Sequence, residues 1–204
     1  ALEHPLVLPD KMKLNVPFNF PSFALNSLTV KAFNAAYYNK VLKEKQEMII
    51  DYDVFFYPLD GVLNWNRIYG KRGFTQYQFV LPTEAGREGL STILSRIASS
   101  GQGSFLAVLK LFGEQDDLIA FPRAGYTLAL DFPIRNGLFS LLDELDSMVL
   151  DYGGRLYLAK DVRMKPQMFD KGYAHSEQFK SIKKTYDADN KFASRQSKRI
   201  GVGL

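Results

Sequence analysis

The stretch that decides the fold runs from Phe74 to Phe112 and reads FTQYQFVLPTEAGREGLSTILSRIASSGQGSFLAVLKLF. Alternating apolar residues predict a strand over Phe74–Leu81, which Pro82 ends. Thr83 is placed to cap a helix whose apolar residues recur at three- and four-residue spacing. A glycine-rich turn follows, and Ser104–Phe112 is predicted to be a second strand. The stretch therefore predicts a β-α-β unit.

A second set of elements continues this order. We predict a third strand over Tyr126–Phe132, a helix capped by Asn136, and a fourth strand over Arg155–Ala159. Gly153 and Gly154 indicate the helix end, because glycine tolerates the left-handed conformation found there. The order β-α-β-β-α-β is the split-βαβ or ferredoxin-like arrangement. Right-handed crossovers place both helices on one face of an antiparallel sheet, so we predict an α+β fold with one open face.

The flanking segments add further elements to this unit. Before it, we expect a helix over Ser22–Val41, a strand over Met48–Phe56 and a short helix over Val62–Tyr69. After it, a helical extension is expected to start near His175. We treat residues 1–204 as a single domain.

The alternation of side chains along the strands predicts what lines each face of the sheet. One side of each strand is apolar and suits the helices. The opposite sides together carry Gln76, Gln78, Lys110, Thr127 and Asp131. This set offers donors and acceptors for a hydroxylated or anionic ligand. A plain solvent-exposed sheet has the same pattern, so both interpretations stay open.

Composition excludes several classes of function. The 204 residues are 46% hydrophobic and 14% aromatic, which is ample for a core. The absence of cysteine excludes disulfides, thiol nucleophiles, iron–sulfur clusters and zinc ribbons. The two histidines, His4 and His175, lie far apart, so neither a Ser-His-Asp triad nor a multi-histidine metal site is expected. No apolar run approaches the roughly 18 residues of a membrane span, so we expect a soluble protein.

Positive charge is concentrated near the end of the chain. The net charge is +4, and residues 180–199 alone carry seven basic and two acidic residues. Such a segment can attract phosphate, nucleic acid or an anionic membrane surface, although a solvated helix and tail is the plainer interpretation. We expect no nucleic-acid partner, because no nucleic-acid-binding module accompanies the charge.

Five segments resemble, in order and spacing, the C-terminal substrate-binding domain of FAD-linked oxidases of the vanillyl-alcohol-oxidase type. They are FFYPLDGVLNWNRIYGKRGFTQYQFVLPTE (Phe55–Glu84), SFLAVLKLFG (Ser104–Gly113), FPRAGYTLALDFPIRNGL (Phe121–Leu138), GGRLYLAKDVRM (Gly153–Met164) and DADNKFASRQSKRI (Asp187–Ile200). Within this family the resemblance is to the branch whose substrate is a lipid-phosphate-linked pentose, a precursor of cell wall polysaccharide.

The resemblance implies an activity and partners. It implies oxidation of a sugar hydroxyl by hydride transfer to FAD, in which the cofactor supplies the difficult chemistry. Most of the FAD contacts are expected from an N-terminal FAD domain outside this chain, so these 204 residues alone are expected to be inactive. The implied location is cytoplasmic. Peripheral contact with the inner membrane is a hypothesis that rests on the basic C-terminal charge alone.

The resemblance also implies roles for individual residues. Lys160 matches a lysine near the flavin and the reacting carbon, where its charge would stabilise an oxyanion or the reduced flavin. A structural salt bridge between Lys160 and Asp161, or another acidic residue, is the alternative. Tyr157 matches a tyrosine that contacts the flavin. Strand alternation puts Tyr157 and Lys160 on opposite sides, so a bend or strand end must bring both to one site.

Five residues are implied to bind the substrate: Gln76, Gln78, Lys110, Ala129 and Phe56. Ala129 occupies the position where the mycobacterial enzymes carry a cysteine, so thiol chemistry is excluded here. Phe56 stands where those enzymes have tyrosine and therefore lacks a hydroxyl. These two departures bear on the identity of the substrate rather than on the type of reaction.

Two other functions remain open. One is the substrate domain of an aldonolactone oxidase, whose relatives often show a His-x-x-Lys pair near the C-terminus. The tail over Ser194–Arg199 contains no histidine, which favours the pentose branch. The other is a stand-alone binding module without catalysis.

Overall fold

A computed structural model of the chain describes residues 13–21, 23–41, 45, 47–57, 59–104, 106–115 and 117–203. The chain divides into two compact units, Ala1–Gly73 and Phe74–Leu204, and each is described here by itself. Residues 1–12 lie outside the described residues. None of the described helices is long and apolar enough to cross a membrane.

The first unit contains short elements. They are β1 (Leu14–Asn15), α1 (Ser27–Tyr38), α2 (Tyr52–Phe56), β2 (Val62–Leu63) and the 3-10 helix η1 (Trp65–Tyr69). Strands β1 and β2 pair in parallel. Helix α1 begins where the Asn26 side chain accepts hydrogen bonds from the backbone N–H groups of Leu28 and Thr29. The predicted N-terminal helix is therefore present, but shorter than expected.

The prediction of a strand over Met48–Phe56 is wrong. Residues 47–51 form no regular element, and Tyr52–Phe56 is the helix α2. Met48 and Ile49 are 62% and 91% exposed. Strand preference reflects packing on a pleated, half-buried surface, and these side chains find no such surface among the described residues.

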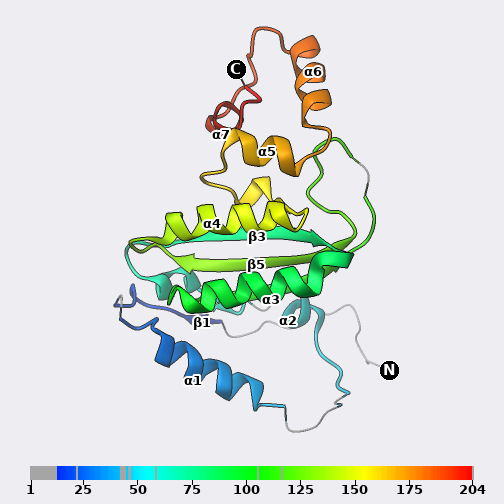
Figure 1. Cartoon of the computed structure of the whole chain (residues 1–204). Coiled ribbons are helices and arrows are strands. Elements are labelled where there is room, and N and C mark those ends of the chain that lie inside the picture. The colour runs from blue at the N-terminus through cyan, green and yellow to red at the C-terminus, as the bar shows by residue number, and fades with distance from the viewer. Residues whose placement is uncertain are drawn as a thin grey trace, which may run out of the picture. The chain divides into compact units, whose positions relative to one another are not determined.

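The second unit contains the predicted sheet (Figure 1). Its elements are β3 (Phe74–Pro82), α3 (Thr83–Ser99), β4 (Leu106–Phe112), β5 (Gly125–Pro133), α4 (Leu138–Asp151), β6 (Arg155–Leu156), the 3-10 helix η2 (Leu158–Lys160), α5 (Pro166–Gly172), α6 (Ser176–Tyr186) and α7 (Arg195–Arg199). The strands are antiparallel in the order β4-β5-β3-β6. The α+β class and the β-α-β-β-α-β order are thereby confirmed, and α5 to α7 form the expected C-terminal extension.

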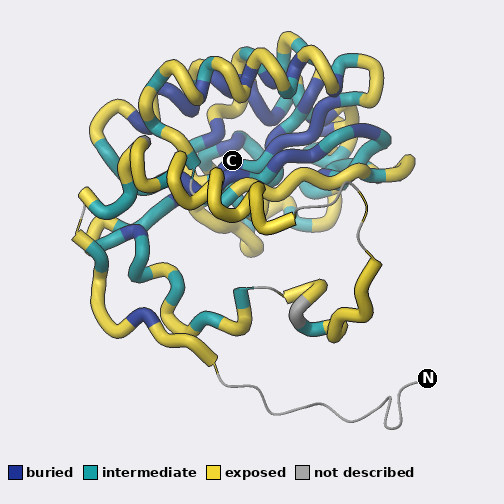
Figure 2. The backbone as a smooth tube through the Cα atoms, turned by 90° about the horizontal axis from the view of Figure 1, so that it is seen from below, coloured by how far each residue is buried: buried dark blue, intermediate teal, exposed yellow. Residues whose placement is uncertain are grey.

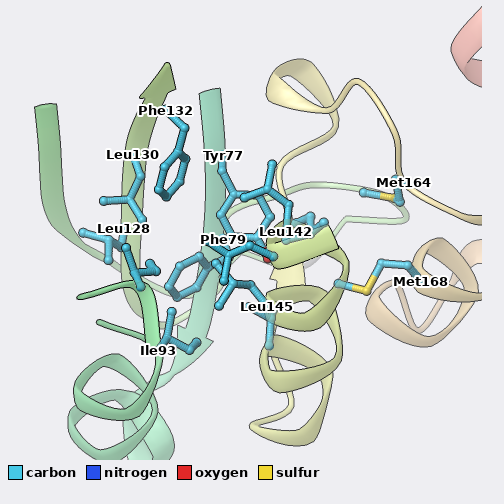
Figure 3. Packing of buried hydrophobic residues seen from close by; sticks show 14 of the residues in the cluster. Tyr77, Phe79, Ile93, Leu128, Leu130, Phe132, Leu142, Leu145, Met164 and Met168 are labelled. Carbon is cyan, nitrogen blue, oxygen red and sulfur yellow. The ribbon is translucent and has the colours of Figure 1, made fainter. Parts of the chain in front are cut away.

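The core lies between one face of the sheet and the helices α3 and α4. Tyr77 pairs with Leu130 and Phe79 with Leu128, and all four side chains are buried. Ile93 of α3 and several leucines of α4 pack on them (Figure 3). Buried residues concentrate in the sheet and on the helix sides that face it (Figure 2). Both helices therefore cover the same face, as predicted.

The edge strand β4 departs from the predicted pattern. Its register places Leu109 opposite Leu128 and Leu111 opposite Tyr126, on the face that the helices cover. Nevertheless Leu109 is 58% exposed and Leu111 is 67% exposed. The helices cover the central strands rather than this edge, so the apolar side of β4 is not part of the core.

The predicted helix caps are also wrong. Pro82 and Gly137 occupy the N-cap positions of α3 and α4, in place of Thr83 and Asn136. Neither N-cap residue makes a side-chain cap. Gly137 has a φ of +80°, which glycine adopts without strain.

Candidate functional site

Strand β3 positions the two glutamines of the candidate site. Tyr77 and Phe79 point into the core, so Gln76 and Gln78 project from the opposite, helix-free face. Gln76 Nε2 donates to Asp131 Oδ1 at 3.0 Å, and Gln78 Nε2 donates to Thr127 Oγ1 at 3.1 Å. The predicted polar face is therefore a set of cross-strand hydrogen bonds, in which Asp131 and Thr127 are buried.

The early end of β6 brings Lys160 to this face. The strand predicted over Arg155–Ala159 stops at Leu156, and the chain turns into η2. Lys160 Nζ then lies 2.5 Å from Gln76 Oε1, to which it donates. Lys160, Gln76 and Asp131 thus form one hydrogen-bonded chain. Strict alternation would put Tyr157 and Lys160 on opposite sides of a strand. Because β6 ends at Leu156, both residues line the same pocket.

Tyr157 lies beside the same strand. Its backbone N–H donates to the carbonyl of Gln78 at 2.8 Å. Its ring stacks on Phe121, with centroids 4.5 Å apart and an interplanar angle of 26°. Phe121 holds one face of the tyrosine ring, a contact that sequence reasoning did not predict.

The carboxylate of Asp161 does not serve as the salt-bridge partner considered for Lys160. Asp161 Oδ1 accepts from the backbone N–H groups of Arg163 and Met164 at 2.8 and 2.6 Å. Arg199 of α7 pairs with Asp161 Oδ2 at 2.8 Å. Asp161 therefore fixes the turn that follows Lys160 and ties it to the C-terminal helix.

A buried polar network supports this turn from the helix side, and sequence reasoning missed it. Arg163 makes a two-point contact with Asp146 of α4 at 2.8 and 2.9 Å, and Tyr77 donates to Asp146 at 3.0 Å. Burial raises the pKa of Asp146, even though Arg163 donates to its carboxylate. Burial, and then the charge of Asp146, raise the pKa of Tyr77 well above its usual range. The sequence feature that could have indicated this network is Asp146, an acidic residue on the apolar face of α4.

The structure brings together four of the residues implied by sequence. Gln76, Gln78, Tyr157 and Lys160 line one pocket with a volume of about 10 Å³, enough for about one water molecule. Lys110 and Ala129 lie on the same face, since Lys110 pairs with Thr127 and Ala129 with Gln78, but they do not line this pocket. Phe56 lies in α2 of the first unit and is 66% exposed.

This arrangement suits a group that gains negative charge. The Lys160 ammonium can donate three hydrogen bonds, and Gln76 accepts one of them. Both glutamines can donate to or accept from hydroxyl groups. The described residues contain no cluster of three or more histidine, aspartate or glutamate side chains that could hold a metal. A cation beside neutral amides fits an oxyanion or the reduced ring of FAD.

Comparisons with known proteins bear on the family of the chain. No family model matches the chain. The decaprenylphosphoryl-beta-D-ribose oxidase of Mycolicibacterium smegmatis is 39% identical over 199 residues, which are 96% of this chain and 42% of the oxidase. This confirms the resemblance to FAD-linked oxidases. An uncharacterized protein in the mprA 5'region of Streptomyces coelicolor is 35% identical over 115 residues, 55% of this chain and 31% of that protein. The chain thus spans less than half the length of either relative.

Proposed function

We propose that this chain is the substrate-binding domain of an FAD-dependent oxidoreductase that oxidises a hydroxyl of a lipid-phosphate-linked pentose. The observation that carries the proposal is the hydrogen bond from Lys160 to Gln76 on the helix-free face of the sheet. The similarity to an oxidase of decaprenylphosphoryl ribose over 96% of the chain supports the substrate class.

The reaction converts a secondary alcohol to a ketone. The substrate carbon loses a hydride, and the proton of its hydroxyl passes to water. When bound, FAD supplies the hydride acceptor. Lys160 would hold the hydroxyl oxygen as negative charge develops there, because a fixed cation in a partly dry site stabilises such charge more than water does. Gln76 orients the ammonium, and Asp131 in turn orients Gln76.

The other residues of this face would recognise the substrate. Gln78 offers its amide to a sugar hydroxyl, and Lys110 offers a positive charge to the phosphate. Tyr157, stacked on Phe121, would contact the flavin with its other face. Ala129 leaves a small apolar surface on β5. A substrate contact by Phe56 stays a prediction from the family resemblance.

The remaining partners belong to this proposal too. Most FAD contacts would come from another domain of the same protein, with which these residues would form the complete site. A lipid-linked substrate would place the enzyme at the cytoplasmic surface of the membrane. The basic residues 180–199 would favour an anionic lipid surface there.

The test uses the full-length product of the gene that encodes this chain. Its visible absorption is recorded, and ribosyl and arabinosyl compounds are added anaerobically. We expect one of them to bleach the flavin band. Lys160→Ala should slow the bleaching by about 10²–10³-fold, which is typical for loss of one group that stabilises developing charge. The matched control is Lys31→Ala, an exposed lysine on α1, which should leave the rate unchanged.

Two results would overturn the proposal. A flavin band that no pentosyl compound bleaches would exclude the substrate class. A protein without any flavin band would make the stand-alone binding module the better description.

A further inference from the structure

The second unit contains a cavity distinct from the pocket at Lys160. It has a volume of about 540 Å³ and lies where β3 ends and where the β4–β5 loop meets the segment between α5 and α6. Arg123 and Arg155 line it, and none of its lining residues lines the Lys160 pocket. A neighbouring cavity of about 450 Å³ shares Arg123 and adds Lys171. We call the larger one the arginine cavity.

Arg155 lines the arginine cavity and forms no ion pair with a carboxylate among the described residues. Its guanidinium lies 5.3 Å from the ring centroid of Tyr173, which covers one side of it. Its Nε is buried and has no hydrogen-bond partner among the described residues. A buried charged donor left unsatisfied is costly. Because Nε is closed to solvent, an acceptor that enters the cavity would bind the Nη atoms of Arg155.

Arg123 places a second positive charge nearby. Its Nη1 donates to the carbonyl of Gly153 at 2.9 Å, which anchors the side chain beside Gly153. Burial, and next the charge of Arg123, lower the pKa of Arg155. Two guanidinium groups close enough to interact repel each other unless an anion lies between them.

The described carboxylates beside this pair do not form ion pairs with it. Glu84, Glu114 and Asp117 also line the cavity, but all three are exposed. Within the described part of the chain, no ion pair joins either arginine to a carboxylate. The described acidic side chains therefore leave the Arg155 guanidinium without an anionic partner.

We propose that Arg123 and Arg155 form a binding site for the phosphoryl group of a small phosphate ester. Guanidinium groups donate parallel hydrogen bonds to phosphoryl oxygens, and a tetrahedral oxyanion can accept from two of them at once. The cavity has room for a phosphoryl group and an attached sugar-sized group. This site does not depend on the proposed oxidase function, since it uses none of the residues near Lys160.

The test follows the Arg Nε–Hε signals of the 204-residue chain by ¹H–¹⁵N NMR, with ionic strength held constant. Arg155→Lys assigns the Arg155 signal by its loss. Inorganic phosphate and ribose 5-phosphate are the probes, and ribose, acetate and chloride are the comparisons. We expect a saturable shift of the Arg155 signal with both phosphates and none with the comparisons.

Two further variants separate the site from general charge and from misfolding. Arg123→Gln keeps the Tyr173 stack and should weaken phosphate binding about tenfold or more. Arg87→Gln removes an exposed arginine of α3 and should leave the affinity unchanged. Each variant is compared only if its amide spectrum shows the folded chain.

Three outcomes would overturn the inference. They are no saturable shift with either phosphate, an equal shift with acetate, or equal weakening in Arg87→Gln and Arg123→Gln. The first would exclude binding, the second would exclude selectivity for the phosphoryl group, and the third would reduce the effect to net charge.

Discussion

Lys160 Nζ lies 2.5 Å from Gln76 Oε1, although 84 residues separate the two in the sequence. The contact exists because β6 pairs with β3 only as far as Leu156 and then turns. A longer β6 would have carried Lys160 away from Gln76. The short length of β6 thus allows Lys160 to reach the polar face of the sheet.

From this contact we predict that replacing Lys160 lowers the activity strongly but changes the stability little. Lys160→Met removes a partly buried side chain with a neutral amide partner, so the free energy of unfolding should change by less than about 1 kcal/mol. Flavin reduction by substrate in the full-length protein should be almost lost. Urea unfolding of the chain and anaerobic reduction of the full-length protein measure the two effects. A large loss of stability would instead make Lys160 a structural residue.

For the buried network of Tyr77, Asp146 and Arg163, we predict an effect on stability. Tyr77→Phe removes the hydroxyl that donates to Asp146, and that carboxylate stays buried with one donor fewer. We expect a loss of about 1–2 kcal/mol in the free energy of unfolding.

Tyr126→Phe is the matched control, since the structure shows no hydrogen bond from the Tyr126 hydroxyl among the described residues. Chemical unfolding of both variants gives the comparison. Equal stability of Tyr77→Phe and the wild type would show that the Asp146 network contributes nothing through this bond.

The order of elements in the second unit could be predicted because the sequence pattern and the packing agree there. Phe79 and Leu128 are buried, and each follows a polar residue, Gln78 or Thr127. The period of two therefore indicated both the strands and their faces. The same alternation placed Gln76, Gln78 and Asp131 together. This much of the site follows from local pattern.

Other features depend on contacts that local pattern does not contain. The stretch Met48–Phe56 is rich in Ile, Val, Tyr and Phe and resembles a strand, yet a strand forms there only if a partner strand is available. The position of Lys160 depends on where β6 ends, and the Arg163–Asp146 pair joins a loop to a distant helix. Each of these is set by tertiary packing, which strand and helix propensities do not report.

Gly125 is predicted to be intolerant of any side chain. Its φ is +149°, and a Cβ there would lie 2.0 Å from the backbone oxygen of Leu81 across the β3–β5 pair. Gly125→Ala should therefore destabilise the chain by at least about 3 kcal/mol, because a backbone atom cannot move away as a side chain can. Gly113→Ala is the control, since a Cβ there meets nothing within 4 Å. Thermal unfolding of the two variants tests this, and similar melting temperatures would refute it.

Asp187 gives a prediction for acid conditions. Its carboxylate accepts from Lys183 Nζ at 2.7 Å and from the backbone N–H groups of Lys191 and Phe192 at 2.7 and 3.1 Å. These bonds, above all the one from Lys183, hold the pKa of Asp187 below its usual value. The folded chain therefore binds this proton more weakly than the unfolded chain. The stabilisation is fully present above the unfolded pKa of about 3.9 and is lost as the pH falls through the lower folded value.

The measurement is urea unfolding of the wild type and Asp187→Asn from neutral pH to about pH 2, a range that spans the titration. Asp187→Asn should be the less stable chain at neutral pH, and the gap should close as acid protonates the wild-type carboxylate. Asp189→Asn is the control, because Asp189 is 77% exposed and its nearest cation, Lys191, lies 3.6 Å away. A gap that stays constant with pH would mean that the asparagine disturbs the turn by its shape, and that the charge of Asp187 does not stabilise the end of α6.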